Sequence, residues 1–153
     1  MANTFENQVR LELYAAFVRE GVAPSAASLA HRLARSPEEI HAAFESLAAG
    51  KAIVLQPQSR EVLMANPLCA VATPYQVDVG GKNFFSSCVW DGLGVIAMLG
   101  GAGVVRSSGA CCGEAMLVRI GRACSAGLVP FPEKNGPVLW PTFNMKDTLA
   151  LSA

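Results

Sequence analysis

Cys88 and Asp91, three positions apart in the segment 83–91, are the residues best placed to do chemistry. The segment leads into a predicted helix, so the two side chains project from nearly the same face. A thiol at a helix N-terminus lies beside unpaired backbone N–H groups and the positive end of the helix dipole, which favours the thiolate. A carboxyl next to that thiolate, and close to Trp90 or Phe85, is disfavoured in its charged form and can hold a proton near neutral pH. One group can bind a soft electrophile while the other supplies a proton, a division that suits protonolysis of a carbon–metal bond.

A purely structural interpretation of this pair is the alternative. Cysteine is among the residue types most often buried, and an aspartate in a first helical turn stabilises the helix dipole without taking part in any reaction. Both interpretations require a helix that begins at this pair.

The cysteine count predicts free thiols. Five cysteines are many for 153 residues, the number is odd, and the polar N-terminus has no secretion signal that would support a disulfide framework. The chain has no Cys-x-x-Cys pair, and the two histidines, His31 and His41, lie far from the cysteines in the sequence. The spacing therefore argues against a structural zinc site.

Two of these thiols, Cys111 and Cys112, are adjacent in a glycine-rich loop. Such a pair can act as a soft-metal clamp, with Cys124 close by in the sequence, or the thiols can be loop or core residues without a shared ligand. Cys69 lies in a predicted strand region and is expected to be buried.

Residues 1–66 predict three helices and a hairpin, which is the pattern of a winged-helix-like module. Apolar residues recur at helical spacing, and serine caps, a proline at a first helical position and terminal glycines mark the ends. The expected helices run from Phe5 to Gly21, from Ser25 to Leu33 and from Ser36 to Gly50, and the expected strands cover 52–56 and 61–64.

The charges of this module argue against nucleic-acid binding. Residues 1–66 contain six Lys and Arg against seven Asp and Glu. The helix that would enter a DNA groove begins with Glu38 and Glu39 in its first turn, where phosphates and base edges would have to be met. We therefore expect a packing module with no nucleic-acid partner.

The dipeptide Asn66-Pro67 marks a boundary, beyond which short strands and glycines dominate. Residues 67–153 predict a small mixed β-sheet with one prominent helix, from Ser86 or Ser87 to Leu99, in a domain that is short at its C-terminal end. The fold class predicted for the whole chain is α+β. The expected strands are 69–73, 75–79, 104–106, 116–120 and 127–130.

Composition and charge limit the cellular location and the kinds of partner that we expect. Hydrophobic residues make up 52% of the chain, and the formal net charge is zero. The longest apolar run, 92–105, falls short of the roughly 20 residues that span a bilayer. We expect a cytoplasmic protein without a membrane partner that acts on a small molecule, and the sequence leaves its oligomeric state open.

Three runs resemble the core signature of the organomercurial (alkylmercury) lyase family: Met64-Ala65-Asn66-Pro67, Ala72-Thr73-Pro74-Tyr75-Gln76-Val77 and Cys88-Val89-Trp90-Asp91-Gly92-Leu93-Gly94. The helical module is also similar to the winged-helix-like domain that precedes the catalytic domain in that family. The resemblance implies that Cys88 is the nucleophile and mercury ligand and that Asp91 protonates the departing carbon. It implies no resident cofactor, and it implies that free small thiols remove the product.

The chain departs from the family at one important position. The family uses a second, downstream cysteine that normally follows a threonine, and Phe143 stands after Thr142 at the matching place here. The resemblance is thus to a divergent member, in which Cys111 and Cys112 are candidates to share the substrate mercury. Two alternatives stay open: an enzyme that uses Cys88 and Asp91 for another thiol-dependent reaction on a small molecule, and a non-catalytic protein that binds or senses a soft metal.

Overall fold

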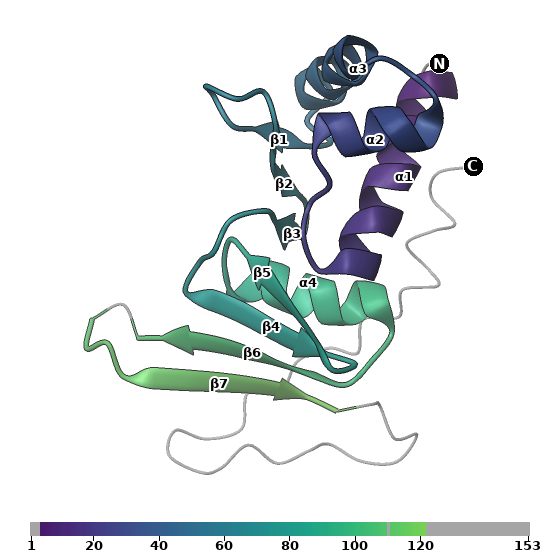
Figure 1. The fold of residues 1–153 in the computed structure, drawn as a ribbon. Coiled ribbons are helices and arrows are strands. Elements are labelled where there is room, and N and C mark those ends of the chain that lie inside the picture. The colour runs from purple at the N-terminus through teal and green to yellow at the C-terminus, as the bar shows by residue number, and fades with distance from the viewer. Residues whose placement is uncertain (1–3, 110, 122–153) are drawn as a thin grey trace. The chain divides into compact units, whose positions relative to one another are not determined.

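The computed structural model describes residues 4–109 and 111–121, and these ranges form an α+β fold (Figure 1). The described part contains four helices and one seven-stranded antiparallel sheet, which confirms the predicted fold class. In chain order the elements are α1 (Thr4–Glu20), α2 (Ala26–Leu33), α3 (Pro37–Ala49), β1 (Val54–Leu55), β2 (Val62–Ala65), β3 (Leu68–Cys69), β4 (Tyr75–Val79), β5 (Lys82–Ser86), α4 (Val89–Leu99), β6 (Gly103–Ser108) and β7 (Ala115–Ile120).

The first three helices begin where the sequence predicted, because their caps are local. Ser25 is the N-cap of α2, and its side chain accepts a hydrogen bond from the Ser28 N–H at 3.2 Å. Ser36 caps α3 in a capping box: the Glu39 N–H donates to Ser36 Oγ at 3.2 Å, and the Glu39 carboxylate accepts from the Ser36 N–H at 2.8 Å. That backbone hydrogen bond holds the pKa of Glu39 below its usual value. The comparison with a winged helix stays a prediction.

The strands follow the order β1-β2-β3-β5-β4-β6-β7, and neighbouring strands are antiparallel throughout. The structure therefore corrects one detail of the prediction, the mixed sheet. A helical crossover between strands favours parallel pairing. The strands that α4 joins, β5 and β6, do run parallel, but β4 lies between them and pairs antiparallel with both.

Strand β5 is an element that the sequence analysis missed, since it placed the start of a helix at Ser86 or Ser87. Residues Lys82–Ser86 instead pair with β4 across a turn at Gly80-Gly81, where both glycines have positive φ, 61° and 75°. Phe84 of β5 lies opposite Val77 and is buried in the core. The helix consequently begins later than predicted, at Val89.

The region around the predicted boundary joins the helices to the sheet. β2 and β3 form a tight hairpin across Asn66-Pro67, whose peptide bond is cis. The Tyr14 hydroxyl of α1 donates to the Asn66 carbonyl oxygen at 2.8 Å, and Lys82 Nζ donates to the Val18 carbonyl oxygen, near the end of α1, at 3.1 Å. The buried core runs without a break from the helices to the sheet. The division into residues 1–66 and 67–153 stays a prediction, because its second range extends past the described residues.

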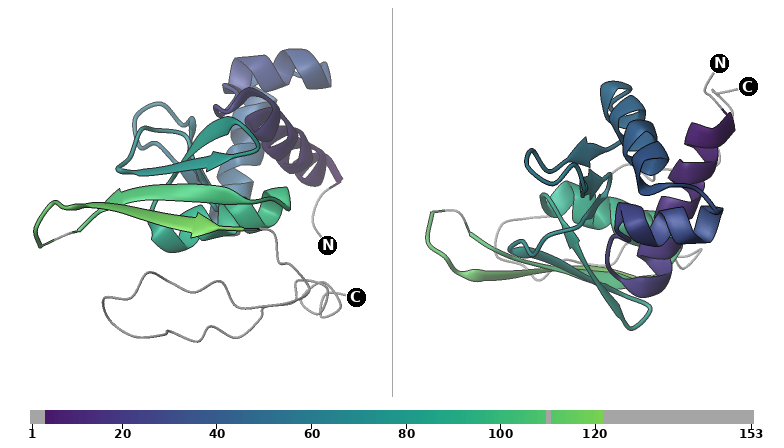
Figure 2. Two further views of the ribbon diagram at one scale, coloured as in Figure 1. Left: turned by 90° about the horizontal axis from the view of Figure 1, so that it is seen from below. Right: turned by 45° about the horizontal axis from the view of Figure 1, so that its top comes forward.

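Helix α4 packs against β4, β5 and β6 (Figure 2). Val95 and Ile96 fill the interface and are fully buried. The backbone of α4 lies close to the sheet at Gly92, where a Cβ atom would be 2.8 Å from Val105 Cγ1 and 3.2 Å from Ser86 Oγ. Only glycine fits here, so this contact fixes the height of α4 above the sheet.

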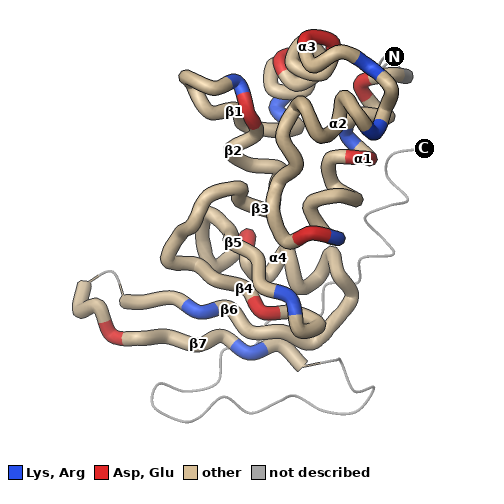
Figure 3. Tube along the Cα trace, viewed as in Figure 1, with Lys and Arg blue, Asp and Glu red and all other residues tan. Residues whose placement is uncertain are grey.

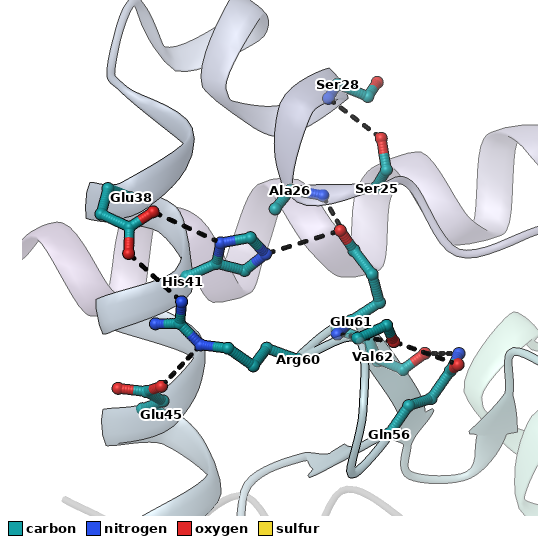
Figure 4. A network of polar contacts seen from close by, with 11 residues as sticks. Ser25, Ala26, Ser28, Glu38, His41, Glu45, Gln56, Arg60, Glu61 and Val62 are labelled. Carbon is teal, nitrogen blue, oxygen red and sulfur yellow. Dashed lines mark hydrogen bonds and ion pairs between the residues drawn. The ribbon is translucent and has the colours of Figure 1, made fainter.

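Glu61 connects α2, α3 and the β1–β2 hairpin (Figure 4). Its Oε2 accepts a hydrogen bond from the Ala26 N–H at the start of α2 at 2.9 Å, and its Oε1 lies 3.5 Å from Nε2 of His41 in α3. Next to it, Arg60 pairs with Glu45 of α3 at 2.8 Å. The predicted hairpin is thereby tied to the helices through polar side chains as well as through the core.

The predicted lack of nucleic-acid and membrane partners rests on charge and hydropathy. Positions of acidic and basic residues are interspersed along α1 to α3 (Figure 3), and Arg32 of α2 pairs with Glu12 and Glu20 of α1. Among the four helices of the described ranges, none has both the length and the apolar character needed to cross a bilayer. The lack of a nucleic-acid partner and the cytoplasmic location stay predictions.

Replacing Gly92 with alanine should destabilise the fold by about 1–2 kcal/mol. The added methyl group overlaps Val105, which is fully buried, and the better helix propensity of alanine offsets only part of that cost. Urea denaturation measures the change. Gly50→Ala is the matched control, because its Cβ atom would meet neighbours at an ordinary 3.6 Å, and equal stabilities of the two variants would contradict the close approach of α4.

The Glu61→Ala variant should lose about 1–2 kcal/mol of stability, because the N–H that begins α2 and His41 both lose their contact with the carboxylate. Thermal and urea unfolding check this expectation. Glu45→Ala removes an equally charged group whose side chain is 54% exposed, and its stability should stay close to that of the unmodified protein. A loss as large in Glu45→Ala as in Glu61→Ala would argue against a special role for Glu61.

Candidate thiol–carboxylate site

The site lies where β5 ends and α4 begins. Cys88 is the N-cap residue of α4, with φ −157° and ψ 175°, rather than a member of the first turn as the sequence analysis placed it. Its sulfur accepts a hydrogen bond from the Asp91 N–H at 3.4 Å, in the role that a serine or aspartate oxygen usually takes. An N–H aimed at sulfur stabilises negative charge on that atom. The predicted proximity of Cys88 to the helix N-terminus is therefore present, with Cys88 as the cap because the helix begins two or three residues later than predicted.

The side chain of Asp91 turns back toward the cap. Cys88 Sγ donates to Asp91 Oδ2 at 3.5 Å, so thiol and carboxylate are hydrogen-bonded partners. Ser87 Oγ donates to the same oxygen. The structure thus brings the two predicted residues together and adds a third, Ser87, which the sequence analysis did not single out. The signal was available, because Ser87 and Asp91 are four residues apart and meet across the first helical turn.

A buried hydroxyl holds this junction in place. Ser86 is fully buried, and its hydroxyl can donate to either of two carbonyl oxygens, that of Cys88 at 3.0 Å or that of Tyr75 at 3.2 Å. The Thr73 hydroxyl donates to the Ser86 carbonyl oxygen at 2.7 Å. These bonds tie the chain before α4 to the start of β4, so the position of Cys88 is set by strand pairing as well as by the helix.

The site lies at the surface of the part of the chain that the structure describes. Cys88 and Asp91 are half-buried, and Ser87 is exposed. The indole of Trp90, between the two reactive residues in sequence, is 63% exposed. A ligand can therefore reach the sulfur without any opening of the core.

The other described cysteines lie away from this pair. Cys69 is buried in β3, as predicted, where it pairs with Phe85 of β5. Cys111 and Cys112 are exposed in the turn between β6 and β7. Within residues 4–109 and 111–121, no group of three or more Cys, His, Asp and Glu side chains is arranged to hold a metal ion. Cys124 and Phe143 lie outside the described residues.

The sheet register explains the separation of the two thiol sites. Tyr75 of β4 pairs with Ser86 of β5, and Gln76 pairs with Arg106 of β6, so the β6–β7 turn leaves the sheet at the end where Cys88 lies. Two strand spacings of about 4.8 Å separate β5 from β6, and β6 continues at about 3.3 Å per residue before the turn. The two sites therefore share one end of the sheet but are on the order of 15 Å apart.

Comparison with known proteins gives similarity to solved structures only. No family model matches the sequence, and no curated protein matches it. Among solved structures, the mercury-bound form of MerB2 superposes with a TM-score of 0.62 at 20% sequence identity. The fold is similar to that of MerB2. The match covers 78% of this chain and 57% of the MerB2 chain, so this chain spans little more than half of its neighbour's length.

Alkylation of the folded protein should distinguish the thiols by position. Iodoacetamide should modify Cys88, Cys111 and Cys112 readily, whereas Cys69, only 5% exposed, should react more than about 100-fold more slowly because the sheet must open first. Peptide mass spectrometry over a time course gives the rate at each residue, and denaturant should remove the difference. Equal rates at Cys69 and Cys111 in the folded protein would contradict the burial of β3.

Proposed function

We propose that this protein cleaves carbon–mercury bonds, as a divergent relative of the organomercurial lyases. The observation that carries the proposal is the hydrogen bond of 3.5 Å between Cys88 Sγ and Asp91 Oδ2 at the N-terminus of α4. The similarity of the fold to a mercury-bound protein supports the same chemistry, as does the resemblance of the segment around Cys88 to the lyase signature.

The first step is capture of the substrate. The thiol proton passes from Cys88 Sγ to the Asp91 carboxylate, and the thiolate forms a bond to the mercury of an organomercury cation. Soft sulfur binds soft mercury strongly, and the Asp91 N–H that points at the sulfur stabilises its charge as the proton leaves. The proton is then held by Asp91, which donates it in the second step.

The second step is protonolysis. The proton moves from Asp91 to the carbon atom bonded to mercury, and the electron pair of the carbon–mercury bond becomes the new carbon–hydrogen bond. Asp91 returns to its carboxylate form, and mercury(II) stays on the Cys88 sulfur. The thiol proton thus ends on the released hydrocarbon, and Asp91 acts as a general acid within hydrogen-bond reach of the reacting atoms.

Release of mercury requires a second thiolate, because mercury(II) prefers two sulfur ligands in a line. Cys88 supplies one, and a free small thiol from solution supplies the other and then carries the metal away by exchange. The exposure of the site favours this route over transfer to Cys111 or Cys112, which lie at the far tip of the β6–β7 hairpin.

The test is to incubate the protein with phenylmercuric acetate and excess small thiol and to follow benzene release by gas chromatography. The unmodified protein should release many equivalents of benzene. Cys88→Ser should release none, and Asp91→Asn should capture the substrate but release benzene about 100-fold more slowly. Asp78→Asn, a carboxylate change in β4 away from the pair, is the control and should match the unmodified protein.

Other outcomes discriminate the alternatives. One mercury held on Cys88 without benzene release would contradict cleavage and favour soft-metal binding. Loss of release in the double variant Cys111→Ser/Cys112→Ser would instead assign the second mercury ligand to the hairpin turn. Failure of Cys88 to take up the mercurial would favour another thiol-dependent reaction at the same pair.

A further inference from the structure

Asp91 Oδ2 receives two donors, Ser87 Oγ and Cys88 Sγ. Among the described residues, no donor contacts the other oxygen, Oδ1. A carboxylate oxygen has two lone pairs, so the serine hydroxyl occupies one of them and leaves the other for the thiol. The two hydrogen bonds fix the rotation of the carboxyl group, which a single bond would leave free.

Ser87 is well suited to this task because its own position is fixed by its neighbours. It stands between Ser86, which is fully buried and hydrogen-bonded on both sides, and Cys88, which caps α4. Its side chain is not the helix cap and is exposed, so it is not needed to fill the core. Its hydroxyl has one described partner, which is Asp91.

We propose that Ser87 is a positioning residue that holds Asp91 Oδ2 against the Cys88 sulfur. The role rests on the proposed function, in which the proton travels from sulfur to Asp91 and on to carbon. With the hydroxyl in place, the lone pair that receives the thiol proton faces the sulfur, and after capture the same oxygen faces the mercury-bound carbon. Without the Ser87 hydroxyl, the carboxyl group rotates away from the sulfur, and the proton on Asp91 no longer points at the mercury-bound carbon.

Loss of the Ser87 hydroxyl should affect two rates in opposite directions: benzene release should slow, and alkylation of Cys88 should accelerate. Protonolysis slows when the acid is misplaced by even about 1 Å, so Ser87→Ala should lower benzene release per captured mercurial about ten-fold. Capture should persist in this variant, because the thiol proton can pass to water instead and the sulfur no longer donates a hydrogen bond to the carboxylate. The alkylation rate of Cys88 at pH 7 should therefore rise about two- to five-fold, in the same direction as in Asp91→Asn.

The decisive experiment is a double-mutant cycle on the alkylation rate of the Cys88 peptide, followed by mass spectrometry with iodoacetamide in the full chain. Ser87→Ala should accelerate the reaction, whereas the same change in an Asp91→Asn background should add nothing, because its effect passes through Asp91. Ser87→Thr keeps the hydroxyl and should restore the original rate. Ser46→Ala, an exposed serine of α3, is the matched control.

The outcomes keep the two proposals separate. Alkylation does not require carbon–mercury cleavage, so the Ser87 coupling is measurable even if the unmodified protein releases no benzene. An unchanged alkylation rate in Ser87→Ala, or an equal acceleration with Asp91 already replaced, would overturn the positioning role. Faster alkylation with the expected loss of benzene release in Ser87→Ala, both reversed in Ser87→Thr, would establish it.

Discussion

The close approach of α4 to the sheet at Gly92 is the contact on which the rest of the site depends. With no side chain at this position, the helix backbone rests directly on Val105 of β6 and beside the Ser86 hydroxyl of β5. Because Gly92 follows Asp91 directly, the same contact sets the height and rotation of the first helical turn. The thiol, the carboxylate and the serine hydroxyl then have little freedom, since all three belong to the short stretch between β5 and Gly92. A rigid support of this kind is what a proton transfer between neighbouring groups requires.

The sequence predicts the features that depend on neighbouring residues better than those that depend on contacts between distant segments. The caps Ser25 and Ser36 were predicted correctly, because a cap is decided by residues within one turn. The pairing of Cys88 with Asp91 was predicted for the same reason. Strand β5 was not, since Lys82 and Asn83 are polar and only the pairing with β4 makes the segment a strand. Strand pairing depends on distant partners, and local propensity describes it poorly.

The antiparallel order of the sheet illustrates the same point. The sequence predicts strand 75–79, a helix and strand 104–106, and such a succession favours parallel neighbours. The unpredicted strand β5 reverses the chain between β4 and α4, so β4 and β6 are neighbours but run antiparallel. Ser87 is a different case, because its four-residue spacing from Asp91 was visible in the sequence. The spacing alone did not distinguish a serine that contacts the carboxylate from an exposed serine, and only the structure shows the hydrogen bond.

The capping role of Cys88 links two processes that are usually described apart. The sulfur that accepts the Asp91 N–H is also the atom that a soft electrophile would occupy. A bond to mercury withdraws electron density from this sulfur and leaves it a weaker acceptor than the free thiolate. Occupancy of the sulfur and fraying of the α4 N-terminus are therefore coupled, on a scale of at most the roughly 1 kcal/mol that a cap is worth. Departure of the metal restores the cap, and the helix end therefore favours the empty state. Under the proposed carbon–mercury cleavage, this coupling would favour release of the bound mercury.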